Sequence, residues 1–191
     1  MNAERLERRS VEIGFRAQLE ERVLHGYAAV FDTETPIGGK AGFVERIRRG
    51  AFKRSLASGR DILGLKDHDP AAVLGRTKSR TLTLREDAHG LEFELSVPAT
   101  TLGNDLLTMA RRGDLGGVSF GFRVEEAGQR WQGRLRELID VDLLEISIIS
   151  SFPAYAQTVV NARAAEAWGA PSRLIFARRW LDTAGGADGL P

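Results

Sequence analysis

The sequence predicts an α+β protein built mainly from an antiparallel β-barrel, with a few helices around the barrel and a helical C-terminal tail. Two observations lead to this fold class. Between about residues 11 and 151 the chain consists of short runs in which apolar and polar residues alternate, separated by glycine, proline or charged turns. Beyond residue 153 the composition changes to alanine and arginine, which favour helices. Closure into a barrel would hide the edges of the sheet.

Alternating runs are predicted as half-buried strands. In residues 91–97 the side chains of Leu91 and Phe93 share one face, while Glu92 and Glu94 share the other. By the same pattern we expect strands at residues 11–15, 26–31, 80–86, 91–97, 117–124 and 141–150.

Two interruptions of the strand pattern predict helices that pack on the barrel. Residues 50–59 carry Phe52 and Leu56 four positions apart, and residues 101–114 repeat apolar side chains at helical spacing until Gly113 ends the run. The tail is expected to form two short helices followed by a flexible end. The predicted organisation is therefore an N-terminal arm (1–10), a β-barrel domain (11–160) and a tail (161–191).

The composition excludes several classes of function. Hydrophobic residues make up 42% and charged residues 28% of the chain, and the 27 basic side chains nearly balance the 26 acidic ones. This balance is typical of a soluble globular protein and does not favour a general nucleic-acid surface. The absence of cysteine excludes disulfides, thiol catalysis and cysteine-ligated zinc. Neither a signal peptide nor a membrane span is indicated, so we expect a cytoplasmic protein.

His68 is the least ordinary of the three histidines. Within residues 61–70, DILGLKDHDP, it comes after the apolar part of the segment and lies between Asp67 and Asp69, and Pro70 follows Asp69. It is therefore expected in a turn at the end of a strand. Catalytic groups often occupy such rigid positions. No HxH or HxxxH pair is present, so a metal site and any cofactor are not expected, and a role as a base stays open beside an ordinary turn residue.

Ser119 is the best candidate nucleophile. It lies in a predicted strand, after Gly116 and Gly117 and two residues before Gly121. Glycines allow close approach of another backbone, and their amides can face a developing oxyanion. The letters match the G-x-S-x-G elbow of α/β hydrolases, but no βαβ pattern surrounds them. On its own the pentapeptide is weak evidence for catalysis.

Glu145 is a carboxylate inside an apolar predicted strand, where an unpaired charge is costly to bury. An arginine partner or an exposed strand face would satisfy it, and so would a role in orienting His68, as the acid of a serine-histidine-acid set does.

Five ordered segments resemble the prohead (capsid-maturation) proteases of tailed bacteriophages, a family similar in fold to the herpesvirus assemblins. The resemblance extends from about residue 11 to residue 156. The segments are GYAAVFDT, FVERIRRGAFKRSL, DILGLKDHDPAAVLGR, LTMARRGDLGGVSFGFR and DVDLLEISIISSFPAYAQT.

This resemblance implies a role for each candidate residue. His68 corresponds to the family's catalytic histidine and Ser119 to its nucleophile. The acid is carried onto Glu145, with the nearby carboxylates as rivals. Backbone amides, that of Gly117 among them, and Arg111 or Arg112 would assist at the oxyanion, although both arginines could instead stabilise a helix C-terminus. The rival carboxylates are Asp67, Asp69, Asp140 and Asp142.

The resemblance also implies a serine endopeptidase that acts inside the immature phage capsid in the bacterial cytoplasm. Its protein substrates would be the scaffold, the N-terminal segment of the major capsid protein, and the protease itself, cut in the tail after Pro153. It further implies a homodimer, and we expect a contact with the portal. The balanced charge and the lack of a long apolar segment predict neither a nucleic acid nor a membrane as a partner. Two alternatives stay open: a non-catalytic β-barrel module that binds capsid or portal surfaces, and an esterase acting on small molecules.

Overall fold

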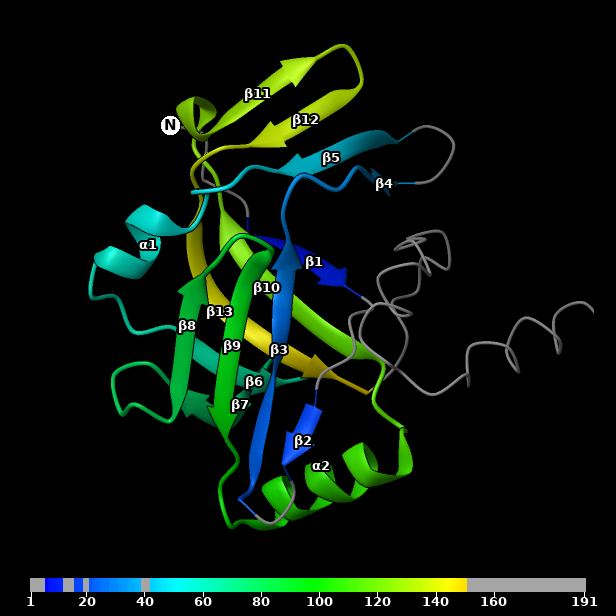
Figure 1. The fold of residues 1–191 in the computed structure, drawn as a ribbon, viewed down its shortest axis with the longest axis vertical. Coiled ribbons are helices and arrows are strands. Elements are labelled where there is room, and N and C mark those ends of the chain that lie inside the picture. Colours follow the sequence, from blue (N-terminus) through cyan, green and yellow to red (C-terminus); the bar gives the residue numbers. More distant parts are fainter. Residues whose placement is uncertain (1–5, 12–15, 19–20, 39–41, 151–191) are drawn as a thin grey trace, which may run out of the picture. The chain divides into compact units, whose positions relative to one another are not determined.

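The computed structural model describes residues 6–11, 16–18, 21–38 and 42–150, all within the first of two compact units, residues 1–160 and 161–191 (Figure 1). The predicted tail lies outside the described residues. The elements in chain order are β1 (Glu7–Val11), β2 (Arg16–Gln18), β3 (Val23–Val30), β4 (Thr35–Ile37), β5 (Phe43–Ile47), α1 (Lys53–Ala57), β6 (Leu63–Lys66), β7 (Asp69–Arg76), β8 (Leu82–Glu86), β9 (Gly90–Ser96), α2 (Thr101–Arg112), β10 (Gly117–Arg123), a 3₁₀ turn (Glu126–Gly128), β11 (Gln129–Gln132), β12 (Leu135–Leu138) and β13 (Asp142–Ile149).

The described strands form three open sheets. The first has the order β1-β10-β13-β6-β7, the second β2-β3-β9-β8, and the third β11-β12-β5-β4. The prediction of a mainly β fold with few helices is confirmed, but these strands do not close into one barrel. Each sheet keeps its own edge strands because consecutive strands such as β7 and β8 continue into different sheets. Most pairs are antiparallel, whereas β13–β6 and β12–β5 are parallel.

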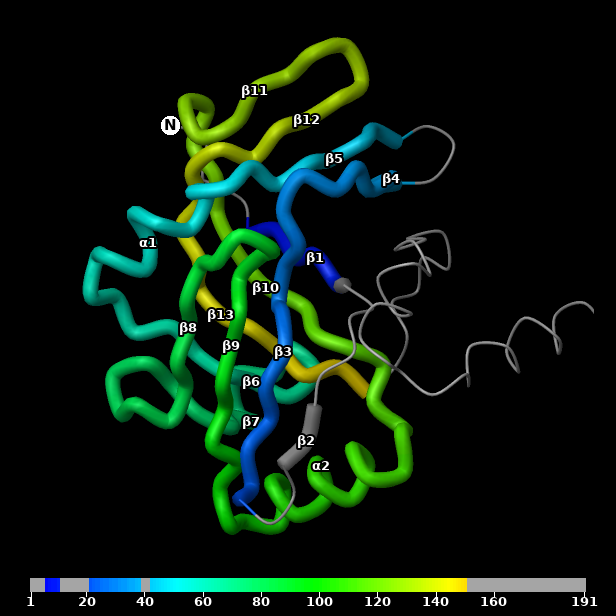
Figure 2. The backbone as a smooth tube through the Cα atoms, in the orientation of Figure 1, coloured from blue at the N-terminus to red at the C-terminus, as the bar shows by residue number. Residues whose placement is uncertain are grey.

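The core lies between the first two sheets, whose strands β3 and β10 are in contact (Figure 2). Phe120 and Phe122 project into it from β10, Phe93 from β9, and Phe52 from the residue before α1. The Phe52 ring meets the Phe120 ring edge to face, with centroids 5.6 Å apart. Burying each such ring stabilises the fold by about 1.5–3 kcal/mol, so this cluster fixes the position of β10.

The two helices begin and end at residues that the sequence identifies. Helix α1 is shorter than predicted, and Gly50 and Gly59 on either side of it adopt positive φ angles of 91° and 70°. In α2 the Thr100 hydroxyl accepts a hydrogen bond from the Gly103 amide, and Gly113 ends the helix in the left-handed conformation, as predicted. No helix among the described residues is long and apolar enough to cross a membrane.

The β6–β7 hairpin carries His68 in a two-residue turn. Lys66 pairs with Asp69 across the hairpin, and the two residues between them, Asp67 and His68, have φ angles of 51° and 61°. Positive φ at both central residues is the mark of a type I′ turn, which matches the twist of the flanking strands. The predicted turn around His68 is therefore confirmed.

Residues 7–11 form an edge strand of the first sheet. β1 pairs with β10 in antiparallel register, with Ser10 opposite Ser119. The boundary proposed at residue 10 between an arm and the domain thus falls inside a strand.

Candidate active site

The candidate site lies on the first sheet, where segments distant in the sequence become neighbours. Ser119 is in the middle of β10, Glu145 is in the adjacent strand β13, and His68 follows β6, the next strand. Gly121 stands opposite Glu145, and Ser119 stands opposite Ser147. The three predicted site residues therefore come from two adjacent strands and from the turn that follows the next strand of the same sheet.

His68 and Glu145 form a direct hydrogen bond. The Nδ1 atom of His68 lies 2.6 Å from the Oε1 atom of Glu145, and only 17% of the imidazole side chain is exposed. Because an ionised carboxylate only accepts hydrogen bonds, Nδ1 carries the proton in this contact. The Nε2 atom of a neutral imidazole is then free of a proton and able to accept one.

Glu145 is nearly buried and holds three polar partners. Ser147 Oγ donates to its Oε2 atom at 2.7 Å, and the Nε atom of Arg8 lies 3.5 Å from Oε1. Burial, the largest single influence, raises the pKa of Glu145, but the hydrogen bonds from His68 and Ser147 and the charges of His68 and Arg8 together bring that pKa below its ordinary value. The carboxylate therefore stays ionised and can support a positive imidazolium.

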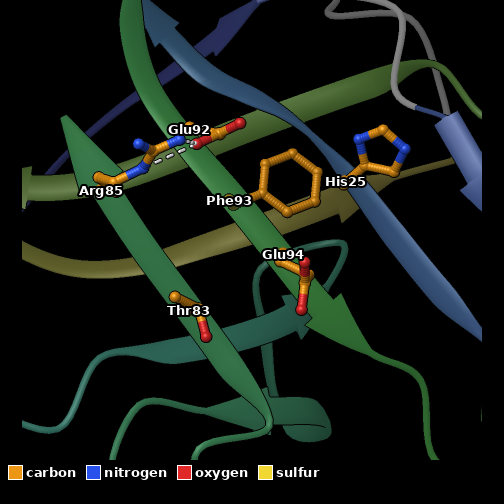
Figure 3. A pocket seen from close by; sticks show the side chains of 6 residues that line it. All are labelled: His25, Thr83, Arg85, Glu92, Phe93 and Glu94. Carbon is orange, nitrogen blue, oxygen red and sulfur yellow. Dashed lines mark hydrogen bonds and ion pairs between the residues drawn. The ribbon is translucent and has the colours of Figure 1, made fainter. Parts of the chain in front are cut away.

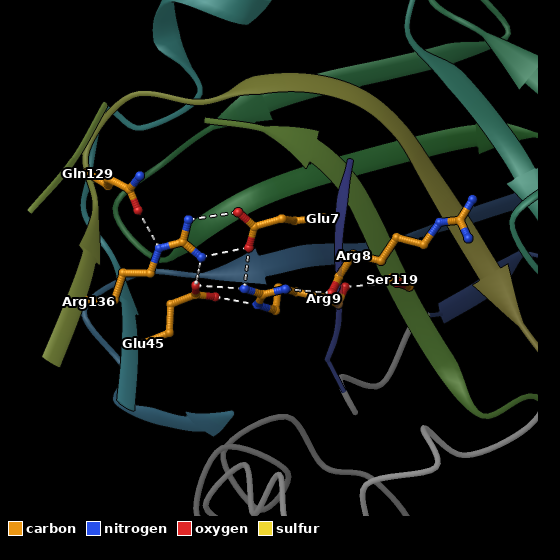
Figure 4. A network of polar contacts seen from close by, with 7 residues as sticks. All are labelled: Glu7, Arg8, Arg9, Glu45, Ser119, Gln129 and Arg136. Atoms are coloured by element: carbon orange, nitrogen blue, oxygen red, sulfur yellow. Dashed lines mark hydrogen bonds and ion pairs between the residues drawn. The ribbon is translucent and has the colours of Figure 1, made fainter. Parts of the chain in front are cut away.

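Ser119 is fully buried, and its hydroxyl donates to the backbone carbonyl of Arg9 in β1 at 2.9 Å (Figure 4). Among the hydrogen bonds of the described residues none joins Ser119 to His68. Register nevertheless brings the two residues near each other. Ser147 stands directly opposite Ser119 with Cβ atoms about 5 Å apart, and its hydroxyl accepts a hydrogen bond from the His68 amide at 3.2 Å.

The four rival carboxylates form hydrogen bonds or ion pairs with groups other than the His68 ring. Asp140 and Asp142 form ion pairs with Arg54, at 2.6 and 2.9 Å. Asp67 accepts from Ser150, and Asp69 accepts from the amide two residues on. Of the five acidic candidates, Glu145 has a hydrogen bond to the His68 ring.

A family profile described as caudovirus prohead serine protease matches residues 4–169. The chain belongs to this family. It is therefore a serine protease, which confirms the predicted enzyme class and favours it over a non-catalytic binding module.

One solved structure supports the fold of this prohead protease. It is the bacteriophage T4 capsid assembly protease gp21, which is 11% identical, covers 78% of this chain and 100% of its own, and gives a TM-score of 0.51. A likeness at this identity concerns the fold alone. A search of curated proteins found no match.

Glycine is needed at two positions of β10, for a different structural reason at each. Gly117 has a φ of 142°, which side-chain-bearing residues rarely adopt. A Cβ atom at Gly121 would lie 2.5 Å from Glu145 Oε1, so glycine makes room for the carboxylate across the strand. The sequence suggested an oxyanion role for the glycines around Ser119, whereas Gly121 is explained by the position of the Glu145 carboxylate.

The predicted oxyanion arginines end the helix that precedes β10. Arg111 and Arg112 are both exposed in the last turn of α2, and Arg112 forms an ion pair with Asp114. Among the described residues no hydrogen bond links either guanidinium to Ser119. Their assistance at the oxyanion, and that of the Gly117 amide, stays a prediction.

Sequence reasoning missed a charged cluster that fastens β1 to the third sheet (Figure 4). Arg9 donates to the buried Glu45 at 2.5 Å, and Arg136 bonds both Glu45, at 3.1 Å, and Glu7, at 2.6 Å. Burial raises the pKa of Glu7, but Arg136 and Arg9 together lower it below the ordinary value. This cluster fixes the strand whose carbonyl accepts the Ser119 hydroxyl. Its members come from three strands that are distant in the sequence, β1, β5 and β12, so no sequence spacing indicates the cluster.

One surface hollow is separate from these residues. It has a volume of about 350 Å³ on the second sheet and includes His25 and the Arg85–Glu92 ion pair (Figure 3). None of the predicted catalytic residues lines it. The described residues hold no group of three or more acidic or histidine side chains arranged to bind a metal.

Proposed function

We propose that Ser119, His68 and Glu145 form the catalytic set of this prohead protease, with Ser119 as nucleophile, His68 as general base and Glu145 as the orienting acid. The observation that carries the proposal is the 2.6 Å contact between His68 Nδ1 and Glu145 Oε1. It orients the imidazole so that Nε2 is available to take a proton, the arrangement that serine-histidine-acid sets require.

In the first step the Ser119 hydroxyl turns from the Arg9 carbonyl to Nε2 of His68. Rotation about one side-chain bond moves a serine oxygen between staggered positions. The hydroxyl oxygen then attacks the carbonyl carbon of the scissile peptide bond while Nε2 takes its proton. The imidazolium formed is stabilised by the Glu145 carboxylate, and it returns the proton to the leaving amine.

In the second step water hydrolyses the acyl-enzyme, with His68 again as base. Backbone amides near the start of β10 would hold the oxyanion, with Arg111 or Arg112 assisting. The main support for an amide contribution is the unusual backbone conformation of Gly117.

The substrates proposed from family membership are proteins of the immature capsid: the scaffold, the N-terminal segment of the major capsid protein, and the protease's own tail after Pro153. The protease would act inside the immature head as a dimer, in contact with the portal. The predicted self-cleavage region lies outside the described residues, as does the proposed tail.

Co-expression with the major capsid protein of the same phage tests this function, with the intact masses of both chains as the readout. Wild-type protease should shorten the capsid protein, whereas Ser119→Ala should leave it intact. Ser55→Ala is the matched control, because Ser55 is also buried and hydrogen-bonded, to the backbone of Leu143. Cleavage by the folded Ser119→Ala variant would refute the nucleophile assignment.

A further inference from the structure

The Ser147 hydroxyl donates a hydrogen bond to the proposed acid, Glu145, and accepts one from the backbone of the proposed base, His68. Ser147 is fully buried in β13. Its hydroxyl donates to Glu145 Oε2 at 2.7 Å and accepts from the backbone amide of His68 at 3.2 Å. One small side chain therefore connects the carboxylate with the turn that carries the imidazole.

The Ser147 hydrogen bond fixes the rotation of the Glu145 carboxylate. Oε1 accepts from the imidazole and Oε2 from the buried Ser147 hydroxyl, so each oxygen has its own donor. Without the second donor the carboxylate could turn about its last bond, because such terminal torsions have broad energy wells. Arg8 would not replace it, since its side chain is 48% exposed and lies nearest to Oε1.

The other Ser147 hydrogen bond steadies a turn with an uncommon backbone. Asp67 and His68 both have positive φ, which costs energy in residues other than glycine. The turn is tied to β13 at successive points: the Asp67 amide donates to the Ile148 carbonyl at 3.0 Å, and the His68 amide to Ser147 Oγ. Loss of the hydroxyl would leave the His68 amide without this partner.

We propose that Ser147 is a positioning residue of the protease, holding the Glu145 carboxylate and the His68 turn in register with each other. The proposal rests on the catalytic set of Ser119, His68 and Glu145. Ser147 acts through its neighbours and does not attack the substrate, because its proton is committed to Glu145. Ser119, its partner across the ladder, instead donates to a backbone carbonyl that a rotation can release.

The test measures phosphonylation of the full-length protease by an alkyl fluorophosphonate over a range of probe concentrations. This gives the maximal rate of inactivation separately from the probe's apparent affinity. Ser147→Ala should lower the maximal rate by about 10- to 150-fold, the range expected for loss of a hydrogen bond to a charged group. The apparent affinity should stay within twofold. Ser147→Thr, which keeps the hydroxyl, should recover most of the rate.

Proton NMR supplies a readout that a merely structural role would not move. The Nδ1 proton held between His68 and Glu145 should give a low-field resonance that disappears in His68→Gln. In Ser147→Ala this resonance should shift or broaden, whereas in the buried-serine control Ser55→Ala it should stay in place. Ser147→Cys keeps the side-chain volume with a weaker donor, so it replaces the alanine variant if that variant does not fold.

The outcomes separate this proposal from the proposed function. If Ser119→Ala or Glu145→Gln retains the wild-type rate, the catalytic set is wrong. If those two variants are inactive but folded Ser147→Ala or Ser147→Cys keeps the wild-type rate and resonance, the set stands and the positioning role of Ser147 is refuted. Mass spectrometry of the phosphonylated peptide must locate the label on Ser119, and a label on Ser147 would also overturn the proposal.

Discussion

Replacing Glu145 with glutamine tests the centre of the proposed site while keeping the size of the side chain. The carboxylate accepts from His68 at one oxygen and from Ser147 at the other. Glutamine has one oxygen, so one of the two donors must face its NH₂ group. The Ser147 hydroxyl can adapt to an NH₂ group by accepting from it. The imidazole adapts only if its proton moves from Nδ1 to Nε2. A protonated Nε2 can no longer accept the proton of Ser119.

The expected loss follows from these two orientations. If the amide oxygen faces His68, the main loss is that of a charge-assisted bond of about 1.5–3 kcal/mol, or roughly 10- to 150-fold in rate. If the amide nitrogen faces His68, the tautomer is wrong and the loss approaches about 10⁴-fold, as in other serine-histidine-acid sets. Glu145→Gln should therefore lower the maximal rate of phosphonylation by between one and four orders of magnitude.

Asp142→Asn is the matched control for this prediction. Asp142 is the acidic residue nearest to Glu145 along β13, but it pairs with Arg54 at 2.9 Å. Its variant should retain a rate near that of the wild type in the same fluorophosphonate assay, and capsid processing should follow the same order. A Glu145→Gln protease at the wild-type rate, with Asp142→Asn inactive, would move the acid role to Asp142.

Two further predictions concern stability. Arg136→Ala removes one of the two arginines that pair with both Glu7 and Glu45, and Arg9 remains as the other. It should lower the free energy of unfolding by about 1.5–3 kcal/mol, measured by urea denaturation; a loss below about 1 kcal/mol would contradict the role given to the charged cluster. The depressed pKa of Glu145 implies that its ionised form stabilises the fold above the ordinary value of 4.5 and that this contribution is lost as the pH falls through the lower folded-state pKa. The stability difference between wild type and Glu145→Gln, followed by urea denaturation from pH 7 to pH 3, should accordingly shrink on acidification, and a constant difference would refute the assigned shift.

The sequence predicted those parts of the fold whose causes are local. Asp67, His68 and Asp69 before Pro70 indicated the turn, and Gly113 indicated the end of α2, because these residues restrict their own backbone. The closed barrel was wrong for the described strands, since alternation reveals that a strand is half buried but not which strand it pairs with. The parallel pairing of β13 with β6 is an example of what alternation leaves open.

The sequence indicated which residues form the candidate site, but it did not indicate most of the hydrogen bonds that link them. Glu145 attracted attention because a charge in an apolar strand needs a partner. Ser147, two positions on, shares its face by simple alternation, yet its contact with the His68 amide depends on the register of β13 beside β6. The Arg9 carbonyl that accepts from Ser119 was hidden for the same reason, because any residue type presents the same carbonyl.

One face of the first sheet packs in the hydrophobic core, and the other face carries the proposed catalytic residues. Along β10, Phe120 and Phe122 enter the core, while Ser119 alternates with them and faces the other way. Along β13, Ile146 alternates in the same manner with Glu145 and Ser147. Because the same strands carry both faces, the packing of the core also fixes the register that brings the proposed acid, base and nucleophile close together. A one-residue slip of β13 against β10 would bury Glu145 in the core and expose Ile146, so the hydrophobic face itself enforces the alignment of the site.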